Sequence, residues 1–211
     1  MSTEQDLRNE IVDVVDELFA MDMITSTGGN VSARIPDEED AFLITPTRLH
    51  KGGLTPELIV KVKSTGKSYD RRQRPSVETK VHLAIYAAYP DIEAAIHSHA
   101  KMCTVLGLIN GSIPPICVEA VTFSDTQIVP YGLPGTPELC ENVVKALQHS
   151  PAVLLQNHGL LTVGWTVRHA ANHAMALERI VQMMLACKLF GKEPANIPPE
   201  TVDLVKSLGA I

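Results

Sequence analysis

Two histidines, two residues apart in an apolar segment typical of a β-strand, constrain the fold of this chain more than any other feature. The segment is Glu93–Ala100. Because successive side chains of a strand alternate between its faces, His97 and His99 point the same way. A third histidine, His158, follows another strand-like segment at the start of a turn. The two imidazoles on one strand form half of a metal site, and distant segments must supply the rest.

A carboxylate completes the candidate site. Glu78 follows Pro75-Ser76-Val77 in the first turn of an expected helix. Three imidazoles and one carboxylate suit a borderline-soft divalent cation, zinc first, at ligand distances of about 2.0 to 2.2 Å. A lone histidine is usually a structural residue, so the hypothesis rests on the combination of His-x-His with a third histidine in a turn.

A second histidine pair, His169 and His173, lies four residues apart on one face of an expected long helix. That spacing also suits a metal ion, but no acidic or cysteine residue stands beside the pair at ligand spacing. We therefore expect these two histidines to have a structural role.

The composition limits the class of protein. The chain has 211 residues, enough for one well-buried domain, and no segment resembles a linker, so we expect a single domain over residues 1–211. The formal charge of −6 and the lack of a large Lys/Arg cluster argue against nucleic-acid binding. No apolar run reaches the ~18 residues of a membrane-spanning helix. The polar N-terminus resembles no targeting signal, and the four cysteines lack metal-binding spacing, so we expect a reduced, cytoplasmic protein with no membrane contact.

Hydrophobic periodicity predicts helices that alternate irregularly with strands. Helices are expected over 3–21 (with Ser2 and Gln5 as a capping box), 76–89 (with Ser76 as N-cap), 101–109, 136–147, 167–190 and 198–208. Strands are expected after Gly29 and over 41–45, 58–62, 93–100, 152–156 and 160–164, with 58–62 at an exposed edge. With seven to nine strands among five or six helices, we predict a single-domain α/β sandwich whose central mixed or antiparallel sheet is covered by helices.

Two loops are candidate anion sites. In 28–32, two glycines let the backbone turn with positive φ and present N–H groups, helped by the side chains of Asn30 and Ser32. A plain turn is the simpler interpretation of this segment. Residues 45–48 form a second loop, with two hydroxyls and a cation. The short basic run 71–74 is interpreted as a solvated loop, or alternatively as a patch that steers an anion toward the site.

Seven short motifs occur in one order between about residues 5 and 190, nearly the whole chain. They are Gly28-Gly29-Asn30-Val31-Ser32, Leu43-Ile44-Thr45-Pro46-Thr47, Pro75-Ser76-x-Glu78, His82-Leu83-Ala84, His97-Ser98-His99-Ala100, Tyr131 with Gly135-Thr136, and Asn157-His158-Gly159. With these residues the chain resembles the class II aldolase/adducin head family. Each motif is weak alone, and the ordered set is specific.

The resemblance implies roles for particular residues. A Zn²⁺ ion, or another divalent metal such as Mn²⁺ or Co²⁺, is expected on His97, His99 and His158, with Glu78 as a fourth ligand that can leave the metal and act as catalytic acid and base. A phosphorylated small-molecule substrate is expected, and its phosphate pocket would be formed by Gly29, Asn30, Thr47 and Ser76. Arg48, where the family has a glycine, is a further candidate for this pocket. A homotetramer with active sites at subunit contacts is also expected.

The reaction implied by the resemblance is the cleavage of a ketose 1-phosphate, such as L-fuculose 1-phosphate, to dihydroxyacetone phosphate and an aldehyde. Breaking the C3–C4 bond leaves an enediolate, whose charge a divalent cation can stabilise. A rate gain of about 10⁶ needs roughly 8 kcal/mol, whereas an acid–base carboxylate contributes about 10²- to 10⁴-fold. The metal must therefore supply most of the acceleration, while Glu78 shuttles the proton.

Three positions depart from the family pattern. Arg48 replaces a glycine, and it either crowds the phosphate or adds a charged contact to it. Val77 replaces a serine, which removes a phosphate-binding hydroxyl. Val118 stands where the family has a tyrosine that protonates the aldehyde oxygen, so Glu119 or a water would have to deliver that proton.

These departures keep other activities open. A metal-dependent decarboxylase of a 3-oxo acid phosphate, or a dehydratase of a thiosugar phosphate, would use the same metal-stabilised enediolate. Val118 makes decarboxylation more credible, because carbon dioxide needs no proton donor on its oxygen. A non-catalytic adducin-like module is the remote alternative, and the intact set of histidines argues against it.

Overall fold

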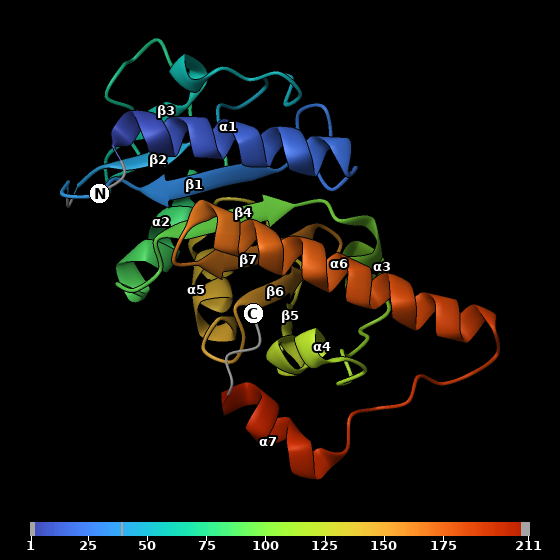
Figure 1. Cartoon of the computed structure of the whole chain (residues 1–211). Coiled ribbons are helices and arrows are strands. Elements are labelled where there is room, and N and C mark those ends of the chain that lie inside the picture. The colour runs from blue at the N-terminus through green and yellow to red at the C-terminus, as the bar shows by residue number, and fades with distance from the viewer. Residues whose placement is uncertain (1–2, 39, 208–211) are drawn as a thin grey trace.

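A seven-stranded sheet is the centre of the structure, a computed structural model that describes residues 3–38 and 40–207 (Figure 1). The strands lie in the order β3-β2-β1-β4-β7-β6-β5. Neighbouring strands are antiparallel except β5 and β6, so the predicted mixed sheet is confirmed. The strands are β1 (Asn30–Arg34), β2 (Phe42–Ile44), β3 (Val60–Val62), β4 (Ala94–Ser98), β5 (Gln127–Val129), β6 (Ala152–Leu155) and β7 (Gly159–Gly164).

Helices cover both faces of this sheet, as predicted. They are α1 (Glu4–Ala20), α2 (Thr79–Ala88), α3 (Lys101–Leu108), α4 (Val118–Phe123), α5 (Pro137–Ala146), α6 (Val167–Leu189) and α7 (Pro199–Ser207), with a 3₁₀ turn η1 (Pro56–Leu58). In β4, Ile96 belongs to the apolar cluster that contains buried residues of α1, α3, α4 and α6, whereas the adjacent Ala95 belongs to the cluster that contains residues of α2 and α5. This alternation follows from the pleat of a strand. Figure 1 shows α1 and α6 in front of the sheet and α5 behind it.

Several element boundaries differ from the predictions. The described residues form seven α-helices instead of five or six, because α4 has only six residues and shows too little periodicity to be recognised in the sequence. The three-residue strand β5 is missed for the same reason. The strand expected over 58–62 begins at Val60, because Pro56 starts the 3₁₀ turn. Among the described residues, no helix combines the length and apolarity needed to cross a bilayer.

Two of the predicted helix caps are also wrong. Thr3 is the N-cap of α1 and forms a reciprocal capping box with Asp6. Ser2 lies outside the described residues. Helix α2 begins at Thr79 with Glu78 as its N-cap residue, so Ser76 lies one turn before the helix. The Ser76 hydroxyl instead accepts a hydrogen bond from the backbone N–H of Glu78 at 3.3 Å.

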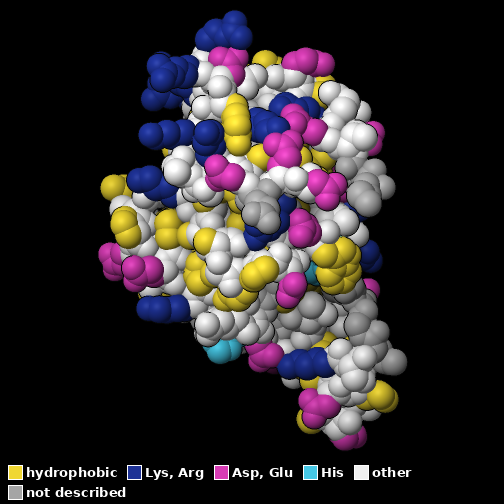
Figure 2. All heavy atoms as spheres, turned by 90° about the vertical axis from the view of Figure 1, so that its left-hand side faces the viewer, with side chains coloured by type: hydrophobic (Ala, Val, Ile, Leu, Met, Phe, Trp, Pro, Cys, Tyr) yellow, Lys and Arg dark blue, Asp and Glu magenta, His cyan; other side chains and the backbone are white. Residues whose placement is uncertain are grey.

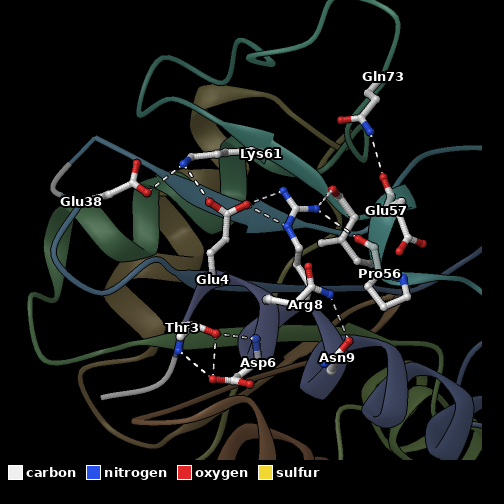
Figure 3. A network of polar contacts seen from close by, with 12 residues as sticks. Thr3, Glu4, Asp6, Arg8, Asn9, Glu38, Pro56, Glu57, Lys61 and Gln73 are labelled. Atoms are coloured by element: carbon white, nitrogen blue, oxygen red, sulfur yellow. Dashed lines mark hydrogen bonds and ion pairs between the residues drawn. The ribbon is translucent and has the colours of Figure 1, made fainter.

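Charged side chains attach helix α1 to the edge strand β3, as Figure 3 shows. The Nη1 atom of Arg8 donates to the carbonyl oxygens of Pro56 (3.1 Å) and Ile59 (2.5 Å). Lys61 forms ion pairs with Glu4 (2.9 Å) and Glu38 (2.8 Å). The predicted edge position of this strand is confirmed, and charges on an exposed edge discourage pairing with another sheet.

Candidate metal and acid–base site

The structure brings together the three histidines that the sequence analysis selects. His97 lies in β4, His99 follows that strand directly, and His158 lies in the turn between β6 and β7. Strand β4 pairs with β7, which places this turn beside the end of β4. The ring centroids are 4.9 Å apart for His97 and His99, 4.5 Å for His97 and His158, and 5.5 Å for His99 and His158. One ring nitrogen from each imidazole lies within 4.8 Å of the other two.

His97 is oriented as a metal ligand would be. Its Nδ1 donates to the carbonyl oxygen of Leu160 at 3.1 Å, because a carbonyl oxygen can only accept. The Nε2 atom of the neutral ring then carries a lone pair, and this buried atom has no hydrogen-bond partner among the described residues. A buried polar atom without a partner costs about 1 to 3 kcal/mol. Metal-binding histidines typically donate their other N–H to a carbonyl in this way.

Burial keeps His97 and His99 in the form that binds cations. It lowers the pKa of His97 well below the ordinary value, and repulsion from His158 and His99 lowers it further. Burial also lowers the pKa of His99, with His158 adding to the effect. A neutral imidazole offers its lone pair to a metal, whereas a protonated one does not. The three donors therefore fit a divalent cation, and the predicted metal site has a chemically suitable set of residues.

Glu78 faces this group of histidines from the start of α2. Its Oε2 atom lies 3.5 Å from Nε2 of His97, and its Oε1 atom lies 3.6 Å from Nε2 of His158. The side chain of Asn30 donates from Nδ2 to Oε2 at 2.6 Å. Glu78 is only 8% exposed, so its carboxylate is largely shielded from solvent. This position suits both the ligand role and the acid–base role expected of it.

The loops predicted to bind phosphate lie side by side. The backbone N–H of Thr47 donates to the carbonyl of Arg74 at 3.0 Å, and that of Ser76 donates to the carbonyl of Thr45 at 3.2 Å. The hydroxyl of Thr45 accepts from the N–H of Val31 at 3.2 Å, which joins the first of these loops to β1. Hydroxyls and backbone groups of three distant segments are thus gathered beside Glu78.

Gly28 and Gly29 are adjacent, and a different structural constraint requires glycine at each position. Gly29 adopts φ +85°, which disfavours other residues, and it leads directly into β1. At Gly28 a Cβ atom would lie 2.5 Å from Cε1 of His99, so any side chain there would displace this imidazole. The Gly-Gly pattern predicts a turn at Gly28, but it does not predict this contact with His99.

Asn30 and Arg48 have positions that the sequence alone does not reveal. Both ends of the Asn30 side chain are hydrogen-bonded, to Glu78 and to His82, so its phosphate-binding role stays a prediction. Arg48 is exposed and adopts φ +60°, a left-handed conformation that explains a glycine at this position of the family pattern.

Positive charge lies close to the candidate phosphate loops. Figure 2 shows Lys and Arg side chains gathered along one side of the upper part of the molecule. An open hollow is lined by Lys63, Lys67, Arg71 and Arg74, and the carbonyl of Arg74 bonds to Thr47. This arrangement favours the anion-steering interpretation of the basic run.

Lys51 is a further cation in this region, and no motif in the sequence points to it. The residue is 1% exposed, and its Nζ donates to the carbonyl oxygen of Pro46 at 2.6 Å. Burial lowers its pKa to about 8. A buried ammonium group beside the 45–48 loop adds positive potential where a phosphate is expected.

Val77 and Val118 lie in different parts of the structure. Val77 is 69% exposed, and a Cβ atom on Gly135 would lie 3.4 Å from the Val77 carbonyl oxygen, so the 135–136 motif adjoins the start of α2. Val118 is the first residue of α4, which packs against α6 and α7, and it is half exposed.

His169 and His173 lie on the opposite face of the sheet and belong to an aromatic cluster. The His169 ring stacks on Trp165, and its centroid lies 4.1 Å from that of His173. The Nδ1 atom of His173 donates to the carbonyl of Val163 at 2.8 Å. Burial lowers the pKa of His173 to about 4. These contacts agree with the expected structural role.

Comparison with known proteins decides the family. A model of the Class II Aldolase and Adducin N-terminal domain matches residues 9–185. The chain belongs to this family. Within the family, the L-fuculose phosphate aldolase of Escherichia coli (strain K12) is 35% identical over 181 residues, covering 85% of this chain and 82% of that protein. A solved L-fuculose 1-phosphate aldolase aligns with a TM-score of 0.88 and 30% identity over 98% of this chain and 97% of the other.

The family also contains a different lyase activity. The 3-oxo-tetronate 4-phosphate decarboxylase of Escherichia coli (strain K12) is 29% identical over 187 residues, covering 86% of this chain and 87% of that protein. The predicted family, the fold class and the assignment of the chain as a lyase are all confirmed. Members of the family have different activities, so the substrate is a separate assignment from family membership.

Proposed function

We propose that the chain is a metal-dependent aldolase that cleaves a ketose 1-phosphate, similar to L-fuculose 1-phosphate, into dihydroxyacetone phosphate and an aldehyde. The observation that carries this proposal is the convergence of three imidazole donors within 4.8 Å of one another, with the Glu78 carboxylate beside two of them. The similarity to L-fuculose phosphate aldolases supports the choice of substrate class.

His97, His99 and His158 would hold the divalent cation, for which zinc is the first choice and Mn²⁺ or Co²⁺ the alternatives. When bound, the cation supplies positive charge that stabilises the negative charge developing on the substrate oxygens. Glu78 accepts the proton of the substrate C4 hydroxyl as the C3–C4 bond breaks, and returns it to C3 of the product. Each proton transfer thus begins or ends on one carboxylate.

The phosphate group would bind where three loops meet. We assign this pocket to Gly29, Asn30, Thr47, Arg48 and Ser76. The backbone bonds that join the loops support the assignment, and the buried ammonium of Lys51 supplies nearby positive charge. Lys and Arg residues around the neighbouring hollow would attract a phosphorylated substrate from solution.

We further propose one domain over residues 1–211, a cytoplasmic location and a homotetramer. The continuous sheet supports the single domain. Large exposed apolar side chains near the end of α6 and on α4 and α7 support burial against other copies; they are Val118, Leu185, Leu189, Phe190 and Leu204. Light scattering would measure the mass in solution, and a monomeric mass would contradict the tetramer.

Aldol synthesis tests the main proposal. The zinc-loaded protein is incubated with dihydroxyacetone phosphate and a panel of short aldehydes, and the products are separated by chromatography. Formation of a ketose 1-phosphate with at least one aldehyde is expected, and chelation of the metal should abolish it. Absence of a new carbon–carbon bond with every aldehyde would refute the aldolase assignment.

Decarboxylation is the second candidate, and Val118 favours it. A valine provides no hydroxyl that could exchange a proton with the C4 oxygen, so in the aldol reaction Glu78 alone must move that proton, whereas a departing carbon dioxide exchanges no proton on its oxygens. The decarboxylase relative in the same family adds support. Release of carbon dioxide from a 3-oxo acid phosphate, together with failure of aldol synthesis, would favour this activity. Loss of water from a thiosugar phosphate would instead indicate the dehydratase.

A further inference from the structure

A continuous chain of hydrogen bonds leads from Glu78 into the protein between α2 and β1. Asn30 donates to Oε2 of Glu78, and its Oδ1 lies 2.5 Å from Nε2 of His82. The Nδ1 atom of His82 lies 2.6 Å from the hydroxyl of Ser32, which lies 2.6 Å from the hydroxyl of Tyr86. We call Asn30, His82, Ser32 and Tyr86 the buried relay.

The sequence places these residues on two facing surfaces. Glu78, His82 and Tyr86 are separated by four residues each, so they share one side of α2 and the turn before it. Asn30 and Ser32 are two residues apart in β1 and share the sheet face covered by α2. The relay therefore combines residues that are four apart along α2 with residues that are two apart along β1.

The chemistry of the groups fixes the direction of every bond. A carboxylate only accepts, so Asn30 turns its amide N–H₂ toward Glu78 and its oxygen toward His82. His82 must then donate from Nε2, which leaves Nδ1 of the neutral ring as an acceptor for the Ser32 hydroxyl. The Ser32 oxygen accepts in turn from Tyr86. Each donor points toward the carboxylate, and bonds aligned in one direction strengthen one another.

Burial keeps the relay neutral and in place. Its four side chains are between 1% and 4% exposed. Burial lowers the pKa of His82 to about 4 and raises the pKa of Tyr86. At the far end, the Arg34 guanidinium lies 5.0 Å from the centroid of the Tyr86 ring and donates to the Tyr86 carbonyl. The relay thus adds no charge of its own next to Glu78.

We propose that the buried relay positions Glu78 by holding its Oε2 atom, which leaves Oε1 free to exchange the substrate proton. This inference rests on the proposed acid–base function of Glu78. Oε1 accepts no hydrogen bond from the described residues, whereas Oε2 accepts from Asn30. A polar network this deeply buried is costly unless every member is paired, and each member here has its partner. His82, Ser32 and Tyr86 act through Glu78 and do not contact the substrate, and the side chain of Asn30 links them to Glu78.

Kinetics of relay variants test the proposal in the metal-loaded enzyme. His82→Leu should lower kcat about 10- to 100-fold, as is typical when a partner behind a metal ligand is lost. KM for the phosphorylated substrate and the number of bound cations should stay unchanged. His82→Gln should recover much of kcat because its amide can donate to Asn30. Tyr86→Phe, which removes only the last hydroxyl, should have the smallest effect.

A matched control separates positioning from general destabilisation. His173 is also a buried histidine bonded to the backbone, but it lies on the other face of the sheet. His173→Leu should lower stability without lowering kcat. Equal kcat losses in His82→Leu and His173→Leu, or an unchanged kcat in His82→Leu, would overturn the relay. So would a rise in KM at constant kcat.

A spectroscopic measurement remains decisive even if the enzyme catalyses a different reaction. Long-range ¹H–¹⁵N spectra of the metal-free, histidine-labelled protein should show His82 as the neutral Nε2–H tautomer, assigned by its disappearance in His82→Gln. An Nδ1–H tautomer or an imidazolium at pH 7 would overturn the bond directions. Failure of aldol synthesis with the expected tautomer present would instead refute the proposed function and leave the relay geometry intact.

Discussion

Two groups of histidines lie on opposite faces of the same sheet, and their surroundings differ. His97, His99 and His158 converge beside a carboxylate, and a buried ring nitrogen of His97 has no hydrogen-bond partner among the described residues. His169 and His173 instead pack against Trp165 and Phe123, and His173 bonds to a backbone carbonyl. Proximity of two imidazoles is therefore not enough to indicate a metal site, whereas three converging donors beside a carboxylate have the chemistry for one.

The largest expected effect is the loss of the cation from the first group. His99→Ala removes one of three donors and should weaken zinc binding by more than 100-fold, since loss of a partner behind a ligand alone costs about 10- to 100-fold. Lyase activity should disappear with the metal. Titration calorimetry of the metal-free protein with zinc measures the affinity.

The corresponding change in the second group provides the control. His173→Ala should leave zinc affinity unchanged, because this histidine lies across the sheet from the three donors. Equal losses of affinity in His99→Ala and His173→Ala would contradict the distinction between the two groups.

A smaller loss is expected when only the carboxylate chemistry is removed. Glu78→Gln keeps the shape of the side chain but cannot take up a proton, so kcat should fall by about 10²- to 10⁴-fold while zinc remains bound. Steady-state kinetics and metal analysis on the same sample measure both quantities.

Another buried carboxylate serves as the comparison for Glu78. Glu178 accepts hydrogen bonds from the backbone N–H groups of Met102 and Cys103, at the start of α3. Glu178→Gln should lower stability and leave kcat unchanged. A loss of activity in this variant as large as that in Glu78→Gln would show that buried carboxylates matter here for folding alone.

Lowering the pH should lower the free energy of unfolding through His173. Burial lowers the pKa of His173 to about 4 in the folded protein, against an ordinary value of about 6.5 in the unfolded chain. Between these values the unfolded chain binds more protons, so the free energy of unfolding falls as the pH decreases from about 6.5 to about 4. One group contributes about 3 kcal/mol to this fall.

Urea denaturation of the metal-free protein at pH 7 and pH 4.5 measures that contribution. His173→Gln can keep the hydrogen bond to Val163 but cannot take up a proton, so it should lose less stability than the unmodified protein over this range. The same loss in both proteins would assign the acid sensitivity to other groups.

The sequence predicts the sandwich and most of its elements, because long amphipathic segments such as 3–21 and 167–190 carry several periods. It does not predict strand order, since pairing between β1 and β4 depends on contacts between distant residues. The short elements α4 and β5 contain too few residues for a period to be recognised.

The candidate site is predictable to a similar extent. His-x-His on a strand and a histidine in a turn are local signals, and they select the three donors. The partner of Asn30 lies 48 residues away, so the sequence analysis assigns this residue to phosphate and not to Glu78. The spacing of Glu78, His82 and Tyr86 by four residues is a usable signal for the relay, although an ordinary buried helix face gives the same pattern.

The smallest expected effect tests the aromatic packing around the second histidine group. Trp165 is 63% exposed, yet its ring stacks on His169 with a centroid distance of 3.3 Å. Aromatic pairs contribute about 0.5 to 1.5 kcal/mol beyond their buried area, so Trp165→Ala should lower the free energy of unfolding by about that amount, whereas Trp165→Phe should retain much of it. Zinc affinity should not change in either variant. If Trp165→Ala weakened zinc binding, the two faces of the sheet would be coupled, and the histidines on them could no longer be treated as separate groups.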